Sequence, residues 1–153
     1  MEIGLAITKI MYMKAGKAGN VAAHLKHSLE YICNEAKTEN RSLVGGINCL
    51  PDYAYEQMIG TKEMFGQVGG RQGYHFIISL KPGEGTTEQM YDIVQRFAEE
   101  FLGGEYEAVF AVHTDKDHLH SHLVFNSVNM INGRKYAVSY THLRAHETTL
   151  HLV

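Results

Sequence analysis

Four histidines lie within ten residues of this sequence, at His113, His118, His120 and His122. In a strand, residues two apart point to the same face, so His118, His120 and His122 would share one face. If the chain reverses at 115–118, His113 would lie across from His120 on the neighbouring strand. Three imidazoles could then converge on one ion and leave coordination positions open for a substrate. The cluster therefore predicts a metal site.

The spacing of the histidines alone does not identify the metal. Imidazole suits zinc, copper, iron and nickel, whereas magnesium prefers oxygen ligands. Asp115 and Asp117 could orient ring nitrogens or add an oxygen ligand. A polar strand face that happens to use histidine is the alternative without a metal. A three-imidazole site could also carry out simple zinc hydrolysis, so residues outside the cluster must decide the chemistry.

The elements that would position this cluster follow from hydrophobic periodicity. Strands are predicted at 3–13, 43–47, 74–80, 107–113 and 119–128, and helices at 21–33 and 53–66. A further helix begins with the capping sequence Thr86–Gln89 and ends at Gly103-Gly104, with an apolar stripe along one side. Helices inserted between strands of this kind predict an α+β domain with an antiparallel sheet.

The composition of the chain limits the number of domains and the cellular location that we expect. The chain has 153 residues, enough for one domain, and a net charge of -3, which gives no bulk electrostatic reason to expect nucleic acid. Two cysteines, Cys33 and Cys49, form no framework and favour a reducing cytoplasm. No apolar run approaches the roughly 20 residues of a membrane span, and no signal peptide is evident. We expect a cytoplasmic protein without membrane insertion.

The C-terminal residues resemble a sequence that does not come from a natural protein. Residues 138–148 read VSYTHLRAHET, which is similar to the translation of a transposase-type sequencing adapter. We therefore expect one domain over 1–137, incomplete at its C-terminus, followed by a non-native tail over 138–153. On this ground His142 and His146, four residues apart, are not interpreted as a second metal site.

Three segments resemble the motifs of a known family. His113-x-Asp115-x4-His120-x-His122, followed by Leu-Val-Phe-Asn126, resembles the third motif of the conjugative relaxases, which are plasmid mobilization nucleases of the HUH endonuclease superfamily. The segment 74–84 resembles their second motif. The segment 29–34, with Lys37-Thr38, resembles the first motif, which carries the nucleophilic tyrosine. The order and gaps fit along 3–137.

This resemblance implies a ferredoxin-like antiparallel sheet, with helices packed on it and the paired-histidine strand at its centre. It implies a DNA nicking and joining enzyme that acts on one strand at an origin of transfer. His113, His120 and His122 would bind a divalent ion, Mg²⁺ or Mn²⁺ in use, with Zn²⁺ also possible. Tyr31 would be the nucleophile, and the product would be a 5′-phosphotyrosine link with a free 3′-hydroxyl.

The resemblance also suggests supporting roles. Asp115, or a water, could accept the Tyr31 proton, and Ser79, Lys81 and Asn126 are candidates for DNA binding. The implied partners are single-stranded or supercoiled DNA at the origin of transfer, accessory mobilization proteins, and a coupling and secretion apparatus. The negative net charge restricts phosphate contacts to local basic regions such as 9–17 and 37–41. We therefore expect this fragment alone to bind DNA weakly, and inactivity of the fragment is one outcome to test.

Three alternatives stay open at this point. A rolling-circle replication initiator or a single-strand transposase of the same superfamily also joins paired histidines to a tyrosine, although those types usually place the tyrosine after the histidines. A three-histidine zinc hydrolase would make Tyr31 irrelevant. A fragment that only binds metal or DNA would have no activity.

Overall fold

The computed structural model describes residues 2–81, 83–115, 119–137 and 147–151. Its strands are β1 (Glu2–Met13), β2 (Val44–Ile47), β3 (Gly73–Leu80), β4 (Ala108–His113), β5 (His120–Asn126) and β6 (Glu147–His151). Its helices are α1 (Ala23–Ile32), α2 (Ala54–Met64) and α3 (Thr87–Leu102), and a short 3-10 turn, η1 (Pro51–Tyr53), precedes α2. The predicted strands and helices are thus found, with boundaries shifted by at most two residues.

The strands form one antiparallel sheet in the order β2-β4-β5-β3-β1-β6. The histidine-bearing strand β5 lies between β4 and β3, which confirms the expected central position. The edge strand β6 pairs with the start of β1 and was not predicted. It lies inside 138–153, and the prediction that this segment is a non-native tail stays a prediction.

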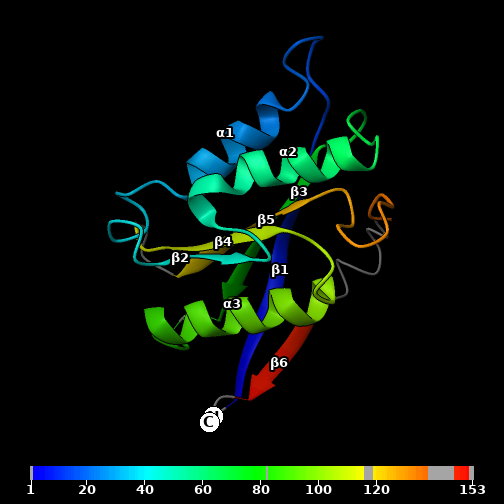
Figure 1. Cartoon of the computed structure of the whole chain (residues 1–153). Helices are drawn as coiled ribbons and strands as arrows, with labels where there is room; N and C mark the ends of the chain where they lie inside the picture. Colours follow the sequence, from blue (N-terminus) through cyan, green and yellow to red (C-terminus); the bar gives the residue numbers. More distant parts are fainter. Residues whose placement is uncertain (1, 82, 116–118, 138–146, 152–153) are drawn as a thin grey trace.

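Helices cover both faces of the sheet, with α1 and α2 on one side and α3 on the other (Figure 1). The arrangement confirms an α+β domain built on a ferredoxin-like antiparallel sheet. Because side chains alternate along each strand, β4 and β5 supply residues to two separate cores, one on each face of the sheet. His120 and His122 of β5 lie on the same one of these faces.

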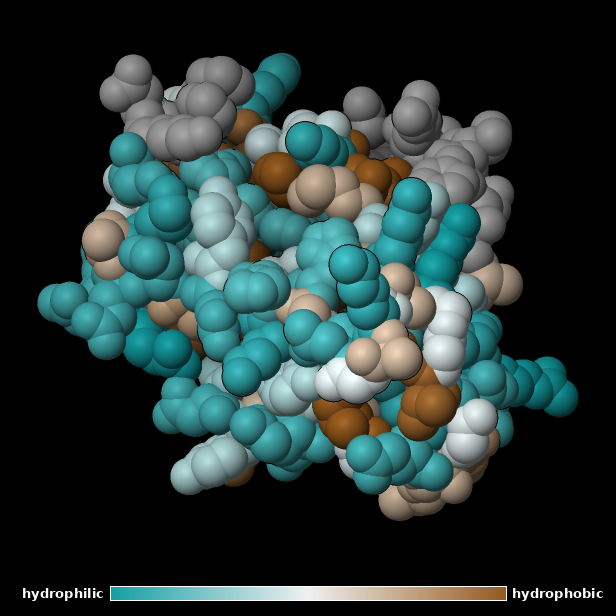
Figure 2. All heavy atoms as spheres, turned by 90° about the horizontal axis from the view of Figure 1, so that it is seen from above, coloured by the Kyte–Doolittle hydropathy of each residue, from teal (hydrophilic) through white to brown (hydrophobic). Residues whose placement is uncertain are grey.

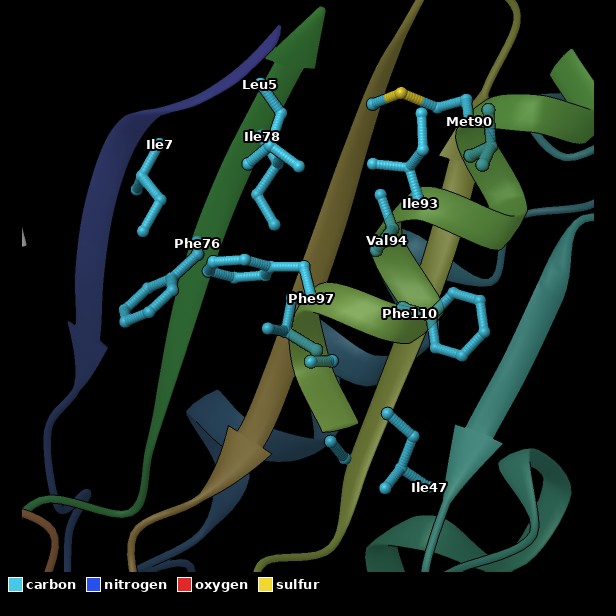
Figure 3. Packing of buried hydrophobic residues seen from close by; sticks show 14 of the residues in the cluster. Leu5, Ile7, Ile47, Phe76, Ile78, Met90, Ile93, Val94, Phe97 and Phe110 are labelled. Atoms are coloured by element: carbon cyan, nitrogen blue, oxygen red, sulfur yellow. The ribbon is translucent and has the colours of Figure 1, made fainter. Parts of the chain in front are cut away.

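The face toward α3 holds the larger core (Figure 3). Met90, Ile93 and Val94 on α3 pack with Phe76 and Phe110 of the sheet, and all five side chains are fully buried. The predicted capping sequence is confirmed, because the Thr86 hydroxyl accepts from the Gln89 N–H and the Gln89 side chain accepts from the Thr86 N–H. Gly103 ends the helix in the left-handed conformation, at φ 61°.

The face toward α1 and α2 holds a smaller core that stops short of one end of the sheet. Leu25, Leu29 and Ile32 of α1 pack there against the sheet. Val124 of β5 belongs to this core, and His122 and His120 follow on the same face at two-residue steps toward the start of the strand. The helix therefore ends where the apolar surface gives way to histidine, and Tyr31 lies at that end.

The outer surface of this side is mostly polar. Seen from above, it is largely hydrophilic, with hydrophobic side chains in small scattered groups (Figure 2). Among the described residues, no helix is both long enough and apolar enough to cross a membrane. Cys33 and Cys49 are both free thiols, as the sequence predicts.

Candidate metal centre and active site

Three histidines meet on the α1 side of the sheet, and we call His113, His120 and His122 the histidine trio. His113 is the last residue of β4 and pairs directly with His120, the first residue of β5. His122 follows two residues later on the same face. One potential ligand atom from each ring lies within 4.8 Å of the other two. The strand register thus brings together the three residues that the sequence singled out, while His118 lies outside the described residues.

The trio is buried and oriented by its neighbours. The exposed fraction is 0% for His113, 8% for His120 and 3% for His122. Nε2 of His113 lies 2.9 Å from the Ile32 carbonyl oxygen, so this nitrogen carries the hydrogen and donates it. Nδ1 of His113 and Nε2 of His122 are buried and have no hydrogen-bond partner in the part of the chain that the structure describes. These two nitrogens are therefore available to bind a metal ion.

A fourth histidine, which the sequence analysis did not assign to the site, supports His122. Nε2 of His75 lies 2.7 Å from Nδ1 of His122, and the two ring centroids are 4.9 Å apart. If Nε2 of His122 binds a metal ion, its Nδ1 carries the hydrogen and donates it to His75. His75 then fixes the ring orientation of a ligand. The one available signal was a lone histidine inside the apolar strand 74–80.

Burial keeps the rings of His75, His113 and His122 neutral. Burial, with a further contribution from the neighbouring histidines, lowers the pKa of His122 to about 2. Burial, and next the charge of His113, lowers the pKa of His75 to about 4. Burial also lowers the pKa of His113 below its ordinary value. Neutral imidazoles are the form that binds metal ions, so the donor set fits a divalent cation. By ligand type, three nitrogen donors favour Zn²⁺ over Mg²⁺.

Tyr31 lies against the trio. Its ring centroid is 5.8 Å from that of His113 and 5.7 Å from that of His122, edge-on to both. Half of the tyrosine is exposed, at 49%, so its ring reaches both the buried histidines and solvent. The structure therefore brings the predicted nucleophile and the three predicted ligands into one site, although some eighty to ninety residues separate them in the chain.

A salt bridge borders the same site. The Lys37 ammonium lies 2.7 Å from an Asp115 carboxylate oxygen and 5.6 Å from the centroid of the Tyr31 ring. The hydrogen bond from Lys37 lowers the pKa of Asp115, and the same bond raises the pKa of Lys37. Asp115 is thus placed as the partner of Lys37, outside the group of possible metal ligands formed by the trio. Its role as acceptor of the Tyr31 proton stays a prediction.

Two of the three candidate DNA contacts lie at the sheet surface near the trio. Ser79 of β3 pairs directly with His120, and its hydroxyl oxygen is 3.5 Å from that of Thr8. Thr8 occupies an irregularity in β1 between Ile7 and Lys9, a feature that often re-aims side chains beside active sites. Lys81 is exposed and follows β3 directly. Both Ser79 and Lys81 stay candidates for contacts to a DNA backbone.

The third candidate, Asn126, is buried at 0% exposure, so its side chain cannot bind DNA. Its amide nitrogen donates to the Met58 carbonyl at 3.2 Å and to the Glu107 carboxylate at 3.0 Å. Its amide oxygen accepts from the ammonium of Lys62, which is 1% exposed. The resemblance suggested a DNA contact for Asn126, whereas here α2 covers its side chain. Asn126 instead links two buried ionisable groups.

We expect Asn126→Ala to destabilise the fold by about 3 kcal/mol, because the buried Lys62 amine and Glu107 carboxylate each lose a hydrogen-bond partner. Urea unfolding followed by circular dichroism would measure this. Asn20→Ala, in an exposed loop, is the control and should change stability by less than about 0.5 kcal/mol. Equal stability of both variants would show that the buried network is not held through Asn126. Mn²⁺ affinity of the folded Asn126 variant should stay unchanged.

Comparison with known proteins agrees with this geometry. The family model described as "Relaxase: MobA/VirD2-like, nuclease domain" matches residues 31–152. A protein named rlx from Staphylococcus aureus is 37% identical over 124 residues, which cover 81% of this chain and 37% of that protein. The group II intron-interrupted relaxase LtrB of Lactococcus lactis is 32% identical over 139 residues, covering 74% of this chain and 25% of LtrB. TraI of Escherichia coli is 27% identical over 90 residues, which cover 58% of this chain and 12% of TraI.

The chain thus spans 37% of the length of rlx and 25% of that of LtrB. The family match begins at Tyr31 and includes the whole histidine trio, so it covers the residues that form the site. With an antiparallel sheet, a central paired-histidine strand and a tyrosine against the histidines, this chain belongs to the MobA/VirD2-like relaxases and carries residues of their nuclease domain.

Proposed function

We propose that this chain cuts one strand of DNA at a specific site and holds the cut end covalently through Tyr31, as the nicking and joining step in the mobilization of a genetic element. The observation that carries the proposal is the contact of a half-exposed Tyr31 ring with His113 and His122. A tyrosine that served packing alone would not need to combine solvent access with two buried imidazoles, each of which has one ring nitrogen without a hydrogen-bond partner among the described residues.

The trio is the set of residues that would hold a metal ion. A divalent cation bound there would polarise the scissile phosphate and offset the charge that builds on its oxygens. The Ile32 carbonyl and His75 keep the His113 and His122 rings in the orientation that this requires. Tyr31, at the end of α1, is positioned to approach a phosphate seated against the trio.

The reaction is a transesterification. The Tyr31 hydroxyl oxygen attacks phosphorus, a new O–P bond forms, and the bond from phosphorus to the 3′ oxygen breaks. The tyrosine proton passes to Asp115 or to water, and the departing 3′ oxygen takes up a proton. The products are a 5′-phosphotyrosine link and a free 3′-hydroxyl. Because one phosphodiester replaces another, the same site can run the reaction backward and rejoin the strand.

The substrate and partners follow from the proposed role. The substrate is single-stranded DNA, or supercoiled DNA locally opened, at an origin of transfer, with Ser79 and Lys81 contacting its backbone. Accessory mobilization proteins and a coupling and secretion apparatus would act with the complete protein. The related replication initiator and transposase activities are disfavoured, since Tyr31 precedes the trio and the chain belongs to a relaxase family.

The test uses a randomised pool of single-stranded oligonucleotides with Mn²⁺, labelled in one arm at the 3′ end and in the other at the 5′ end. We expect the 3′ label to become bound to protein under denaturing conditions, and the 5′ label to appear on a shorter, free strand. Sequencing of the bound DNA should show one preferred cut site. Capture of the 5′ label instead, or no capture in either arm, would contradict the proposal.

A further inference from the structure

We propose that Lys37 is a further catalytic residue of this site, whose ammonium group binds the scissile phosphate and stabilises the negative charge on the attacking Tyr31 oxygen, while Asp115 acts as the positioning residue that holds it. This inference rests on the proposed function. It assigns chemistry to Lys37, which the transesterification described above does not use.

Two backbone hydrogen bonds fix the position of Lys37. Its backbone N–H donates to the Asn34 carbonyl at 3.1 Å, just past the helix that carries Tyr31. Its backbone carbonyl accepts from the Thr114 N–H at 2.9 Å, directly after His113. The loop that carries Lys37 is therefore fastened between the nucleophile's helix and the strand that supplies a ligand. A lysine placed by chance on a surface loop would not need these two attachments.

The side chain is held over the nucleophile. The Lys37 ammonium lies 5.6 Å from the Tyr31 ring centroid and 2.7 Å from the Asp115 oxygen. An ammonium group has three N–H donors, and the bond to Asp115 uses one of them. The other two can face the oxygens of a phosphate approached by Tyr31. The side chains of Lys37 and Asp115 are each 26% exposed, so a DNA strand can reach them.

Lys37 brings a fixed positive charge to a site in which the other rings against Tyr31 are imidazoles. The chain as a whole carries a net charge of -3. A fixed cation beside a developing anion stabilises a transition state more than a ground state. A partly exposed salt bridge adds little to stability, so retention of the fold is not the reason for this pair.

The chain offers a matched control. The Lys26 ammonium lies 5.7 Å from the centroid of the Tyr55 ring, so it makes the same kind of contact away from the trio. Lys37→Met and Lys26→Met each remove one charge and keep the length of the side chain. Lys37→Arg keeps the charge, and Asp115→Asn frees Lys37 without removing it.

The experiment measures single-turnover covalent capture of the oligonucleotide selected with the wild-type chain, as a function of DNA concentration. We expect Lys37→Met to lower the maximal rate by about 100-fold, as loss of one charge-stabilising donor does in other enzymes. Lys37→Arg should recover to within about tenfold of wild type, Asp115→Asn should lose about tenfold, and Lys26→Met should match wild type. Mn²⁺ affinity, measured by calorimetry, should be the same in all of them.

The outcomes separate the two proposals. Capture by Lys37→Met at the wild-type rate overturns the inference and leaves the proposed function intact. A change in half-saturating DNA concentration alone, with an unchanged maximal rate, also overturns it, because Lys37 would then only bind DNA. A parallel loss of Mn²⁺ affinity would show that Lys37 acts through the trio. Absence of capture by the wild-type chain overturns both.

Discussion

Replacing Tyr31 with phenylalanine is expected to abolish covalent capture of DNA, with a loss of at least about a thousandfold, as removal of a nucleophile does in other enzymes. The change deletes the hydroxyl oxygen that would bond to phosphorus. It keeps the ring that packs edge-on against His113 and His122. Thermal stability and Mn²⁺ affinity should therefore match those of wild type. Gel analysis of the labelled DNA under denaturing conditions would measure the loss.

The control for this variant is Tyr53→Phe, because Tyr53 is also exposed, at 61%, but lies on the short turn before α2. It should capture DNA at the wild-type rate. Capture that persists in Tyr31→Phe would place the nucleophile elsewhere. His27 would then be the first candidate, since it is exposed on α1 one turn before Tyr31. Loss of capture in both variants would indicate a general effect on DNA binding.

His122→Ala is expected to weaken Mn²⁺ binding by more than about 100-fold, because loss of even a residue that only supports a ligand commonly costs 10- to 100-fold. His122 is close to each of the other three histidines of the site. Its centroid lies 4.1 Å from that of His113 and 5.2 Å from that of His120, and it bonds to His75. Its removal takes away one donor and frees the ring of His75. Isothermal titration calorimetry would measure the affinity.

His24→Ala provides the comparison, since His24 is an exposed histidine on α1. It should bind Mn²⁺ as wild type does. The His122 variant should also lose covalent capture of DNA while keeping its helix and strand content by circular dichroism. Unchanged Mn²⁺ affinity in His122→Ala would place the ion outside the trio and remove the basis for its role at the phosphate.

Much of this site could be predicted because its spacing is local. His120 and His122 are two residues apart in one strand, and His113 ends the neighbouring antiparallel strand, so side-chain alternation and one strand pairing suffice to bring the rings together. The strand at 74–80 and the helix after Thr86 followed from period-2 and period-3.6 patterns in the same way.

The remaining features depend on how segments far apart in the sequence align with one another, and hydrophobic periodicity does not predict that alignment. His75 reaches His122 only because β3 pairs with β5 in a particular alignment. Lys37 and Asp115 are 78 residues apart and meet because a loop after α1 is attached to the end of β4. The burial of Asn126 could not be predicted, because nothing in the local sequence shows that α2 covers it. β6 was not predicted because its residues lie in a segment interpreted as a non-native tail.

Mass spectrometry of the captured complex tests the central claim most directly. Digestion with nuclease and trypsin should leave a short nucleotide on the peptide 27–37, HSLEYICNEAK, which contains both His27 and Tyr31. We predict that fragment ions will place the added mass, with its phosphate, on Tyr31. Added mass on His27 or on any other residue, or a captured complex with no modified tyrosine, would contradict the account.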